Sequence, residues 1–373
     1  MATSVPAMMK AARLHEIGKP LVIDTIETPH PLHGDVLIRV RACGIVPNLV
    51  NVLQHYPKVA THLPLPPLPA IFGLDPTGEV VAIGTGVDGV HAGDRVYVNP
   101  GRSCGTCRHC WSGDPIACES YTFNGYFGFS PLSKKLFERY PYGGLSEYMT
   151  APVSALVKLP GCVSFNRAAR FGYIGTAYSG LRKAKVGPGS SVLINGGSGT
   201  LGVSAVISAL ALGASKIFAT GRNRGLLASV QAISPGRVEV FSLDDGNLFD
   251  WIKIQTSGQG VDVAMDCLGP GASHTAFTEG LRSVRRGGHF VDVGAVSGDV
   301  SINIGHMMVR NMTLIASLWF TTEEGRQLAA LSATGDLKLS VFEDVTFALG
   351  HVNEALARLD NRRGGFSNFV ITP

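Results

Sequence analysis

Asn195-Gly-Gly-Ser-Gly-Thr-Leu-Gly202 is the stretch that decides the fold of this chain of 373 residues. It follows a short apolar run at 191–195 and leads into a helix-like run at 201–212, which is the context that a phosphate-binding glycine loop requires. Gly197 is expected to make the tight turn, Gly199 to admit a dinucleotide pyrophosphate and Gly202 to let the helix pack on the strand. The alternative is a glycine-rich turn without a ligand. The residues expected to bind the cofactor are Gly197, Ser198, Gly199, Thr200, Leu201 and Gly202.

Short apolar runs at 216–220, 261–266 and 289–293 follow the glycine loop. Continuous apolar strands that alternate with helices indicate a parallel sheet buried on both of its faces. We therefore predict a doubly wound α/β domain of the Rossmann type over residues 174–311. Further cofactor contacts are expected from Cys267, Val293, Gly294 and Ala295.

The end of the second strand indicates which dinucleotide binds. NAD-binding domains place an acidic residue there for the ribose hydroxyl, whereas this chain has Thr220-Gly-Arg-Asn-Arg224. Arginine and asparagine hold a phosphate by charge-assisted hydrogen bonds, so we predict NADP(H). The alternative is that the arginines are ordinary solvated charges. The residues expected to contact the phosphate are Gly221, Arg222, Asn223 and Arg224.

Four cysteines lie within one short loop, at Cys104, Cys107, Cys110 and Cys118. Four thiolates complete the tetrahedral shell that zinc prefers and leave no position open for a substrate, which is typical of a structural site. We therefore predict one structural zinc ion. An iron–sulfur cluster is the chemical rival, since it also binds to thiolates.

Composition excludes several classes of protein. The net charge of +4 and the isoelectric point near 8.7 are too mild for a nucleic-acid-binding surface, and no basic run is present. The longest apolar stretch, 203–214, is shorter than the ~20 residues of a membrane span. The N-terminal stretch lacks the apolar core of a signal peptide, and the cysteine pattern is not that of a secreted disulfide framework. We expect a cytoplasmic protein with no nucleic-acid or membrane partner.

The flanking regions differ from the central one. Residues 1–173 have short Val- and Ile-rich runs separated by glycine and proline, which favours an irregular, β-rich domain. Residues 312–373 contain one amphipathic run at 352–360 and a final apolar run at 368–372. We expect this third segment to rejoin the first domain.

The order of these features resembles that of the medium-chain, zinc-containing alcohol dehydrogenase superfamily over essentially the whole chain. The motifs are Ala42-Cys-Gly-Ile45, Gly73-x-Asp75-x-x-Gly78-Glu-Val80, Gly93-Asp-Arg-Val96, the four-cysteine loop and Gly175-Thr176. The resemblance implies an α/β protein with a GroES-like β-rich catalytic domain (1–173), a structural zinc lobe at about 101–120, a Rossmann domain (174–311) and a return to the catalytic domain (312–373).

The resemblance also implies a second, catalytic zinc, but this chain departs from the family at its ligands. The three ligand positions fall on Val46, on Leu74 and near Gly172, none of which can bind a metal. Asp75 stands where the family has a glutamate beside the zinc, and we expect it to be a structural hydrogen-bond acceptor. We therefore predict no catalytic zinc.

The proton relay of the family is altered as well, with Asn48 and Asn51 at its positions. Amides form hydrogen bonds but do not titrate. We predict Asn48, Tyr56 and Thr176 as candidate catalytic donors, and by resemblance Thr176 also packs on the nicotinamide. A group of aromatic residues after the zinc lobe either lines an apolar substrate pocket or packs in the core. This group is Tyr121, Phe123, Tyr126, Phe127 and Phe129.

Without a metal to polarise a carbonyl, hydride transfer requires an acceptor that is already electrophilic. Our leading hypothesis is an NADPH-dependent reductase of a polarised double bond in a small molecule, an α,β-unsaturated carbonyl above all. One alternative is a metal-free alcohol, ketone or imine oxidoreductase, and another is a nucleotide-binding protein without catalysis. By resemblance the apolar run at 311–319 pairs two copies into a homodimer or homotetramer; the alternative is a buried internal strand.

Overall fold

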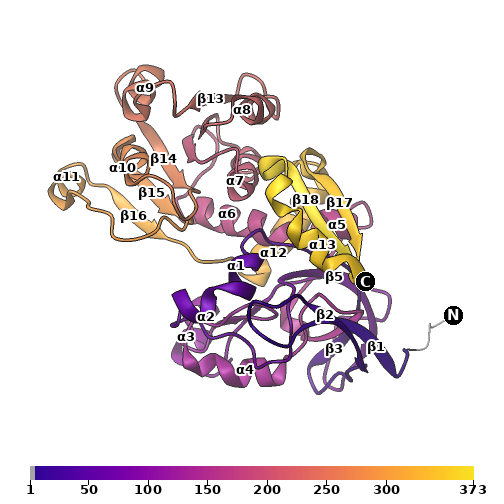
Figure 1. The fold of residues 1–373 in the computed structure, drawn as a ribbon. Coiled ribbons are helices and arrows are strands. Elements are labelled where there is room, and N and C mark those ends of the chain that lie inside the picture. The colour runs from indigo at the N-terminus through magenta and orange to yellow at the C-terminus, as the bar shows by residue number, and fades with distance from the viewer. Residues whose placement is uncertain (1–4) are drawn as a thin grey trace.

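The computed structural model describes residues 5–373 and contains two domains (Figure 1). The predicted domain starting at residue 1 therefore begins outside the described residues. The second domain alternates strands and helices from residue 191 onward. Its elements are β11 (Ser191–Asn195), α7 (Thr200–Ala211), β12 (Lys216–Gly221), α8 (Arg224–Gln231), β13 (Val238–Ser242), α9 (Leu248–Gln255), β14 (Val261–Asp266), α10 (His274–Arg282), β15 (Val284–Asp292), α11 (Ile304–Val309) and β16 (Thr313–Ala316).

The six strands of this domain are all parallel, in the order β13-β12-β11-β14-β15-β16, which confirms the predicted Rossmann sheet. Successive side chains of a strand point to opposite faces, and both faces are covered. Val192 and Ile194 pack in the core that contains Val203 of α7, whereas Leu193 packs in a second core with Phe290. Because all parallel strands end at one edge, the glycine loop lies at that edge.

Two predicted domain boundaries differ from the observed elements. Helix α6 (Phe171–Lys183) spans the boundary at 173/174. Strand β16 pairs with β15, so the Rossmann sheet continues past residue 311 before the chain returns to the first domain. The sequence of β16 is as apolar as that of an internal strand, and only its pairing reveals where it belongs.

The first domain is built from strands that pair antiparallel, apart from β17 and β18, which pair with each other in parallel. Its main sheet has the order β10-β6-β5-β3-β18-β17, with β9 also paired to β3, and a smaller sheet has the order β2-β1-β4. The C-terminal strand β18 pairs with β3, so the last residues rejoin this domain. The strands are β1 (Met8–Leu14), β2 (Val22–Glu27), β3 (Asp35–Gly44), β4 (Ala70–Ile71), β5 (Asp75–Ile83), β6 (Arg95–Val98), β7 (Gly101–Arg102), β8 (Thr122–Phe123), β9 (Tyr148–Pro152), β10 (Leu156–Lys158), β17 (Glu343–Ala348) and β18 (Ser367–Thr372).

The helices outside residues 191–316 are short, apart from two that contain 13 residues. One of these, α12, was not predicted, although Thr321 and Glu324 form a capping box at its start. Within residues 5–373, no helix combines the length and the apolarity needed to cross a membrane. The helices are α1 (Leu49–Gln54), α2 (Tyr56–Val59), α3 (Arg108–Trp111), α4 (Lys134–Arg139), α5 (Phe165–Ala168), α6, α12 (Thr322–Thr334) and α13 (Val352–Ala357).

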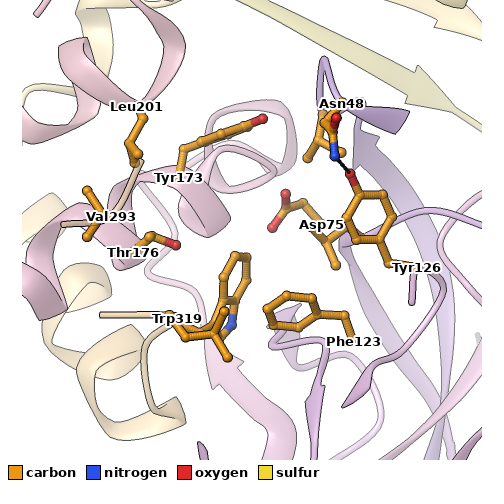
Figure 2. A pocket seen from close by; sticks show the side chains of 12 residues that line it. Asn48, Asp75, Phe123, Tyr126, Tyr173, Thr176, Leu201, Val293 and Trp319 are labelled. Atoms are coloured by element: carbon orange, nitrogen blue, oxygen red, sulfur yellow. Dashed lines mark hydrogen bonds between the residues drawn. The ribbon is translucent and has the colours of Figure 1, made fainter. Parts of the chain in front are cut away.

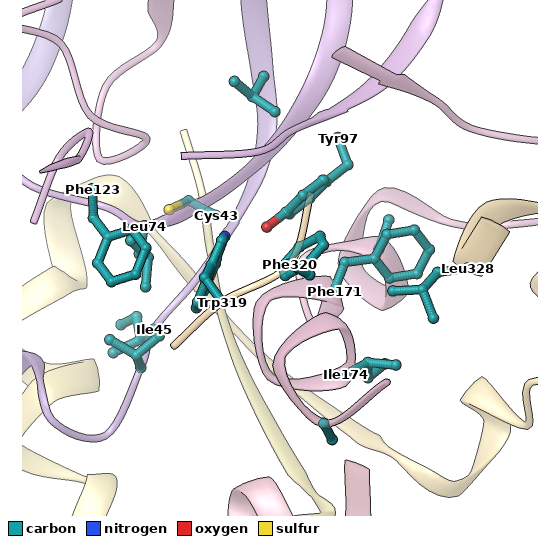
Figure 3. Close-up of a cluster of buried hydrophobic side chains, with 14 of the residues drawn as sticks. Cys43, Ile45, Leu74, Tyr97, Phe123, Phe171, Ile174, Trp319, Phe320 and Leu328 are labelled. Atoms are coloured by element: carbon teal, nitrogen blue, oxygen red, sulfur yellow. The ribbon is translucent and has the colours of Figure 1, made fainter. Parts of the chain in front are cut away.

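Aromatic side chains connect the two domains beside the cleft (Figure 3). The ring centroids of Trp319 and Phe123 are 4.6 Å apart, and those of Trp319 and Phe320 are 5.0 Å apart. Asn99 holds this segment from the first domain, because it accepts a hydrogen bond from the Trp319 indole and donates one to the Phe320 carbonyl. The chain that leaves β16 is thereby anchored as a wall of the cleft.

Candidate functional site

A mostly apolar cavity lies between the two domains (Figure 2). The first domain contributes residues from the ends of its strands and from the loops around α1 and β8, and the Rossmann domain contributes residues next to the glycine loop. The cavity is lined by Val46, Asn48, Leu74, Asp75, Phe123, Tyr126, Tyr173, Thr176, Leu201, Val293, Leu318 and Trp319. The predicted cofactor residues Thr176, Leu201 and Val293 are thus brought together with the predicted donor Asn48.

The positions that hold catalytic zinc in the resembled family are apolar or filled in this cavity. Val46 and Leu74 both line it and are 5% exposed. A Cβ atom added at Gly172 would lie 2.3 Å from Oδ1 of Asp75 and 2.6 Å from its Oδ2. The carboxyl group of Asp75 therefore occupies the space that a side chain at position 172 would need.

Asp75 is buried without an ionic partner among the described residues, and its Oδ1 accepts a hydrogen bond of 2.8 Å from the Tyr97 hydroxyl. Burial raises the pKa of Asp75 to about 7, although the Tyr97 hydroxyl, the Arg170 charge and the Gly172 amide favour the ionised form. The guanidinium of Arg170 donates its hydrogen bonds to backbone carbonyls, including that of Gly365. Asp75 is accordingly a carboxyl group that titrates near neutral pH at the cleft.

Asn48 and two tyrosines form a hydrogen-bonded group at one side of the cavity, and Figure 2 shows the bond between Asn48 and Tyr126. The Asn48 side-chain amide donates to the Tyr56 hydroxyl at 2.8 Å and to the Tyr126 hydroxyl at 3.2 Å. Its Oδ1 accepts from the Asn51 amide at 3.1 Å. Both amide hydrogens of Asn48 are therefore occupied, and each tyrosine keeps its own O–H hydrogen to donate. Tyr126 lines the cavity, whereas Tyr56 does not.

The glycine loop has the geometry that a dinucleotide requires. Gly197 lies in the tight turn, as predicted, because the Gly199 amide donates across it to the Gly196 carbonyl; Gly196, which starts the turn, has a φ of +82°. A Cβ atom on Gly197 would lie 2.7 Å from the Ala219 Cβ, and one on Gly202 would lie 2.1 Å from the Gly196 carbonyl oxygen. Near Gly199 the only such contact is the Gly196 oxygen at 3.3 Å, which leaves space for a phosphate. These residues fit a bound nicotinamide dinucleotide.

Buried polar side chains at the ends of β11, β12 and β14 hold the start of the glycine loop by hydrogen bonds. The Thr220 hydroxyl donates to Asn195 and accepts from the Gly196 amide, and Asn195 donates to Asp266 at 2.9 Å. Burial raises the pKa of Asp266 to about 7. The predicted contacts that follow the next strands are tied to the same edge, because the Cys267 amide donates to the Asn195 carbonyl. The Val293 amide likewise donates to the backbone carbonyl of Asp266, and the Ala295 amide donates to the carbonyl of Leu268. Gly294 lies between Val293 and Ala295 in the sequence and is placed by their two bonds.

The two arginines after β12 are in different situations. Arg224 forms a two-pronged ion pair with Asp245, so its charge is already compensated. Arg222 is exposed and makes no hydrogen bond or ion pair within the described chain. Asn223 caps α8 by accepting from the Leu226 amide. Of the predicted phosphate contacts, Arg222 alone is an uncommitted cation.

The sequence did not reveal that the C-terminal segment covers the glycine loop. The Gly365 amide donates to the Ser198 carbonyl at 2.9 Å, and a Cβ atom on Gly365 would lie 2.1 Å from the Gly199 oxygen. The paired glycines at 364–365 are the only sequence feature that points to a close backbone contact. Nothing in the sequence indicates that the contact is with the glycine loop. Tyr173 and Trp319 are two further cavity residues that were not predicted.

The four cysteines converge as predicted. Their sulfur atoms all lie within 4.8 Å of one another, with Cys107 Sγ 3.6 Å and Cys104 Sγ 3.9 Å from Cys110 Sγ. A tetrahedral ion with Zn–S bonds of about 2.3 Å places its sulfurs about 3.8 Å apart. The cluster therefore fits a structural zinc ion. Among residues 5–373 it is the one group of three or more His, Cys, Asp or Glu side chains close enough to hold a metal.

Comparisons with known proteins agree with this architecture. The model of the alcohol dehydrogenase GroES-like domain matches residues 32–161, and that of the zinc-binding dehydrogenase matches residues 200–334. The chain is 30% identical to sorbitol dehydrogenase of Bacillus subtilis, over 82% of this chain and 80% of that protein. It is 28% identical to acryloyl-coenzyme A reductase of Metallosphaera sedula, over 88% of this chain and 90% of that protein.

The crystal structure of AibC is similar to this fold, with a TM-score of 0.84 and 29% identity over 98% of this chain and 96% of that one. The family models and relatives span both domains, the glycine loop fits a nicotinamide dinucleotide, and the cysteine cluster fits structural zinc. The chain therefore belongs to the medium-chain dehydrogenase/reductase superfamily, and it is an oxidoreductase.

Proposed function

We propose that the protein is an NADPH-dependent reductase of α,β-unsaturated carbonyl compounds that works without a catalytic zinc. The observation that carries this proposal is the replacement of the cleft ligands by Val46, Leu74 and Gly172, with the Asp75 carboxyl in the remaining space. A conjugated acceptor is polarised by its own carbonyl group and has the least need of a Lewis acid. The similarity to an acryloyl-coenzyme A reductase supports the same class of acceptor.

The chain's own residues account for the positioning of such an acceptor. When bound, the reduced nicotinamide supplies a hydride to the β-carbon of the substrate. Thr176, Leu201 and Val293 form the wall on the Rossmann side of the cavity, and the aromatic residues opposite exclude water. The Tyr126 hydroxyl, oriented by Asn48, donates a hydrogen bond to the carbonyl oxygen as negative charge develops there.

The choice of acceptor is tested by following NADPH oxidation with an enone, a saturated ketone and a cyclic imine under identical conditions. We expect turnover with the enone and little with the others. A preference for the ketone or the imine would favour the alternative oxidoreductases. Cofactor binding without turnover on any acceptor would favour a protein without catalysis. Two zinc ions per chain would contradict the absence of a catalytic metal.

The preference for NADPH is proposed to depend on Arg222, because Arg224 is already paired with Asp245. Replacing Arg222→Asp removes a charge-assisted hydrogen bond and adds repulsion, so we expect the ratio of kcat/KM for NADPH over NADH to fall by about 10- to 100-fold. Arg224→Gln is the matched control and is expected to change the ratio less. Equal effects of the two variants would contradict the assignment.

We also propose a homodimer or homotetramer formed through the edge of the Rossmann sheet. Strand β16 is the last strand of that sheet, and Leu314 within it and Leu318 just after it are each 44% exposed. An apolar edge strand of this kind is a ready site for pairing with a second copy. Light scattering of the wild type and of Leu314→Lys tests this, with a smaller assembly expected for the variant.

A further inference from the structure

Asp75 is the acidic side chain of the cavity lining, and the proposed function leaves it unused. It begins strand β5, lines the cavity and points into it between the two domains (Figure 2). Its side chain is only 1% exposed, and its two carboxyl oxygens lie against the first turn of α6 at Gly172. A carboxyl group in this position faces the substrate space and is shielded from bulk water.

No described group around Asp75 forms an ion pair with it, although the nearby Arg170 charge favours its ionised form. Tyr97 of β6 donates a hydrogen bond to Oδ1, and Cys43 of β3 is buried close by with its thiol pKa raised by burial. Arg170 and Tyr173 approach from α6 and the turn before it, but both terminal nitrogens of Arg170 donate to backbone carbonyls and its buried Nε makes no hydrogen bond to Asp75. With no counter-ion bonded to it, the carboxyl group favours its protonated form until near pH 7.

Reduction of an α,β-unsaturated carbonyl requires a proton as well as a hydride. We propose that Asp75 is the general acid that delivers this proton to the α-carbon of the substrate, an assignment that rests on the proposed function. The hydride pair forms the new C–H bond at the β-carbon. The π pair of the C=C bond then forms a double bond between the α-carbon and the carbonyl carbon, and the π pair of the C=O bond moves to the oxygen, which gives an enolate. The enolate then re-forms the C=O bond, and its α-carbon takes the proton from Asp75. The resulting carboxylate recovers a proton from water after the product leaves.

The tyrosines of the cavity are suited to a different task. Burial raises the pKa of both Tyr126 and Tyr173, so neither readily gives up its proton in this apolar environment. They donate hydrogen bonds to the enolate oxygen and keep their protons. Asp75 is thereby separated in role from the hydrogen-bond donors, which is the division of labour expected for an acid and an oxyanion site.

The test uses carvone, whose reduction creates a stereocentre at the protonated α-carbon. For the wild type we expect kcat to fall as the pH rises through about 7, because Asp75 must be protonated to act. Asp75→Asn should lower kcat by about 100-fold or more, abolish this alkaline limb and erode the diastereomer ratio of the product. NADPH affinity, measured by fluorescence, should stay unchanged. Asp88→Asn, at an exposed aspartate, is the matched control.

A second variant keeps the proposal falsifiable if Asp75→Asn fails to fold. Tyr97→Phe removes the hydrogen bond that favours the ionised carboxylate, so the alkaline limb should move to higher pH. A purely structural Asp75 would not shift the pH profile in either variant. If Asp75→Asn keeps the wild-type rate, pH profile and diastereomer ratio, the assignment is wrong while the proposed function stands. If the wild type reduces no enone, the proposed function and this assignment both fail.

Discussion

The four-cysteine lobe and the floor of the cleft differ in the donor atoms that they offer to a metal ion. In the lobe, four sulfur atoms lie within 4.8 Å of one another and fit a tetrahedral ion. In the cleft, Val46, Leu74 and Gly172 occupy the corresponding positions, and the Asp75 carboxyl fills the space beside Gly172. The comparison teaches that a chain can carry all the donor atoms of one metal position and none at the three residues of another, because each position depends on its own side chains.

The largest effect is expected from removing one cysteine ligand of the four-cysteine lobe. Cys107→Ser removes one of four thiolates, so we expect zinc content to fall from about one ion per chain to nearly none. Because metal binding contributes directly to folding, the thermal midpoint should fall by about 5 °C or more. Elemental analysis and calorimetry measure the two effects. Cys162→Ser, at an exposed cysteine outside the cluster, should change neither. Retained zinc in Cys107→Ser would refute the assignment of the site.

An intermediate effect is expected from crowding the cleft floor. Gly172→Ala would place a Cβ atom 2.3 Å from the Asp75 Oδ1, so the carboxyl group or helix α6 must shift. We expect the free energy of unfolding to fall by about 1–3 kcal/mol, as for overpacked cores, together with a loss of kcat. Gly161→Ala has no atom within 4 Å of the added carbon and is the matched control. Similar results for both variants would show that Asp75 does not fill this space.

The smallest effect is expected from restoring a single donor in the cleft. Val46→Cys adds one thiolate beside Leu74 and Gly172, which supply no ligand. Asp75 would then be the only other cysteine, histidine or carboxylate side chain on the cavity wall, so we expect zinc to stay at about one ion per chain after dialysis against zinc. Elemental analysis checks this against the wild type treated alike. A second tightly bound ion would mean that the cleft is closer to a metal site than its residues indicate.

Much of the fold was predictable because its signals are local. The glycine loop between an apolar run and a helix identified the Rossmann domain, and the spacing of four cysteines identified the metal lobe. Strand β16 lies after the predicted boundary at 311/312 but belongs to the Rossmann sheet. The composition of an apolar strand does not indicate which sheet it joins. Helix α12 was missed, although its capping box is visible in the sequence.

The candidate site was predictable only in part. Asn48 was expected to be a direct donor, but both of its amide hydrogens are taken by Tyr56 and Tyr126. Arg224 was expected to hold a phosphate, but it is paired with Asp245. Of the aromatic residues after the zinc lobe, Phe123 and Tyr126 reach the cavity. Each of these outcomes depends on a partner that is distant in the sequence.

By itself, the sequence determined which donor atoms exist: four thiolates in the lobe, and none at three positions of the cleft. It also determined the glycine loop, because close backbone approach requires glycine wherever the loop occurs. Only the tertiary structure decided that the Asp75 carboxyl turns into the space beside Gly172 and loses its contact with water. The reason is physical: the identity of a ligand is a property of one residue, whereas burial and proton affinity depend on everything that packs around it.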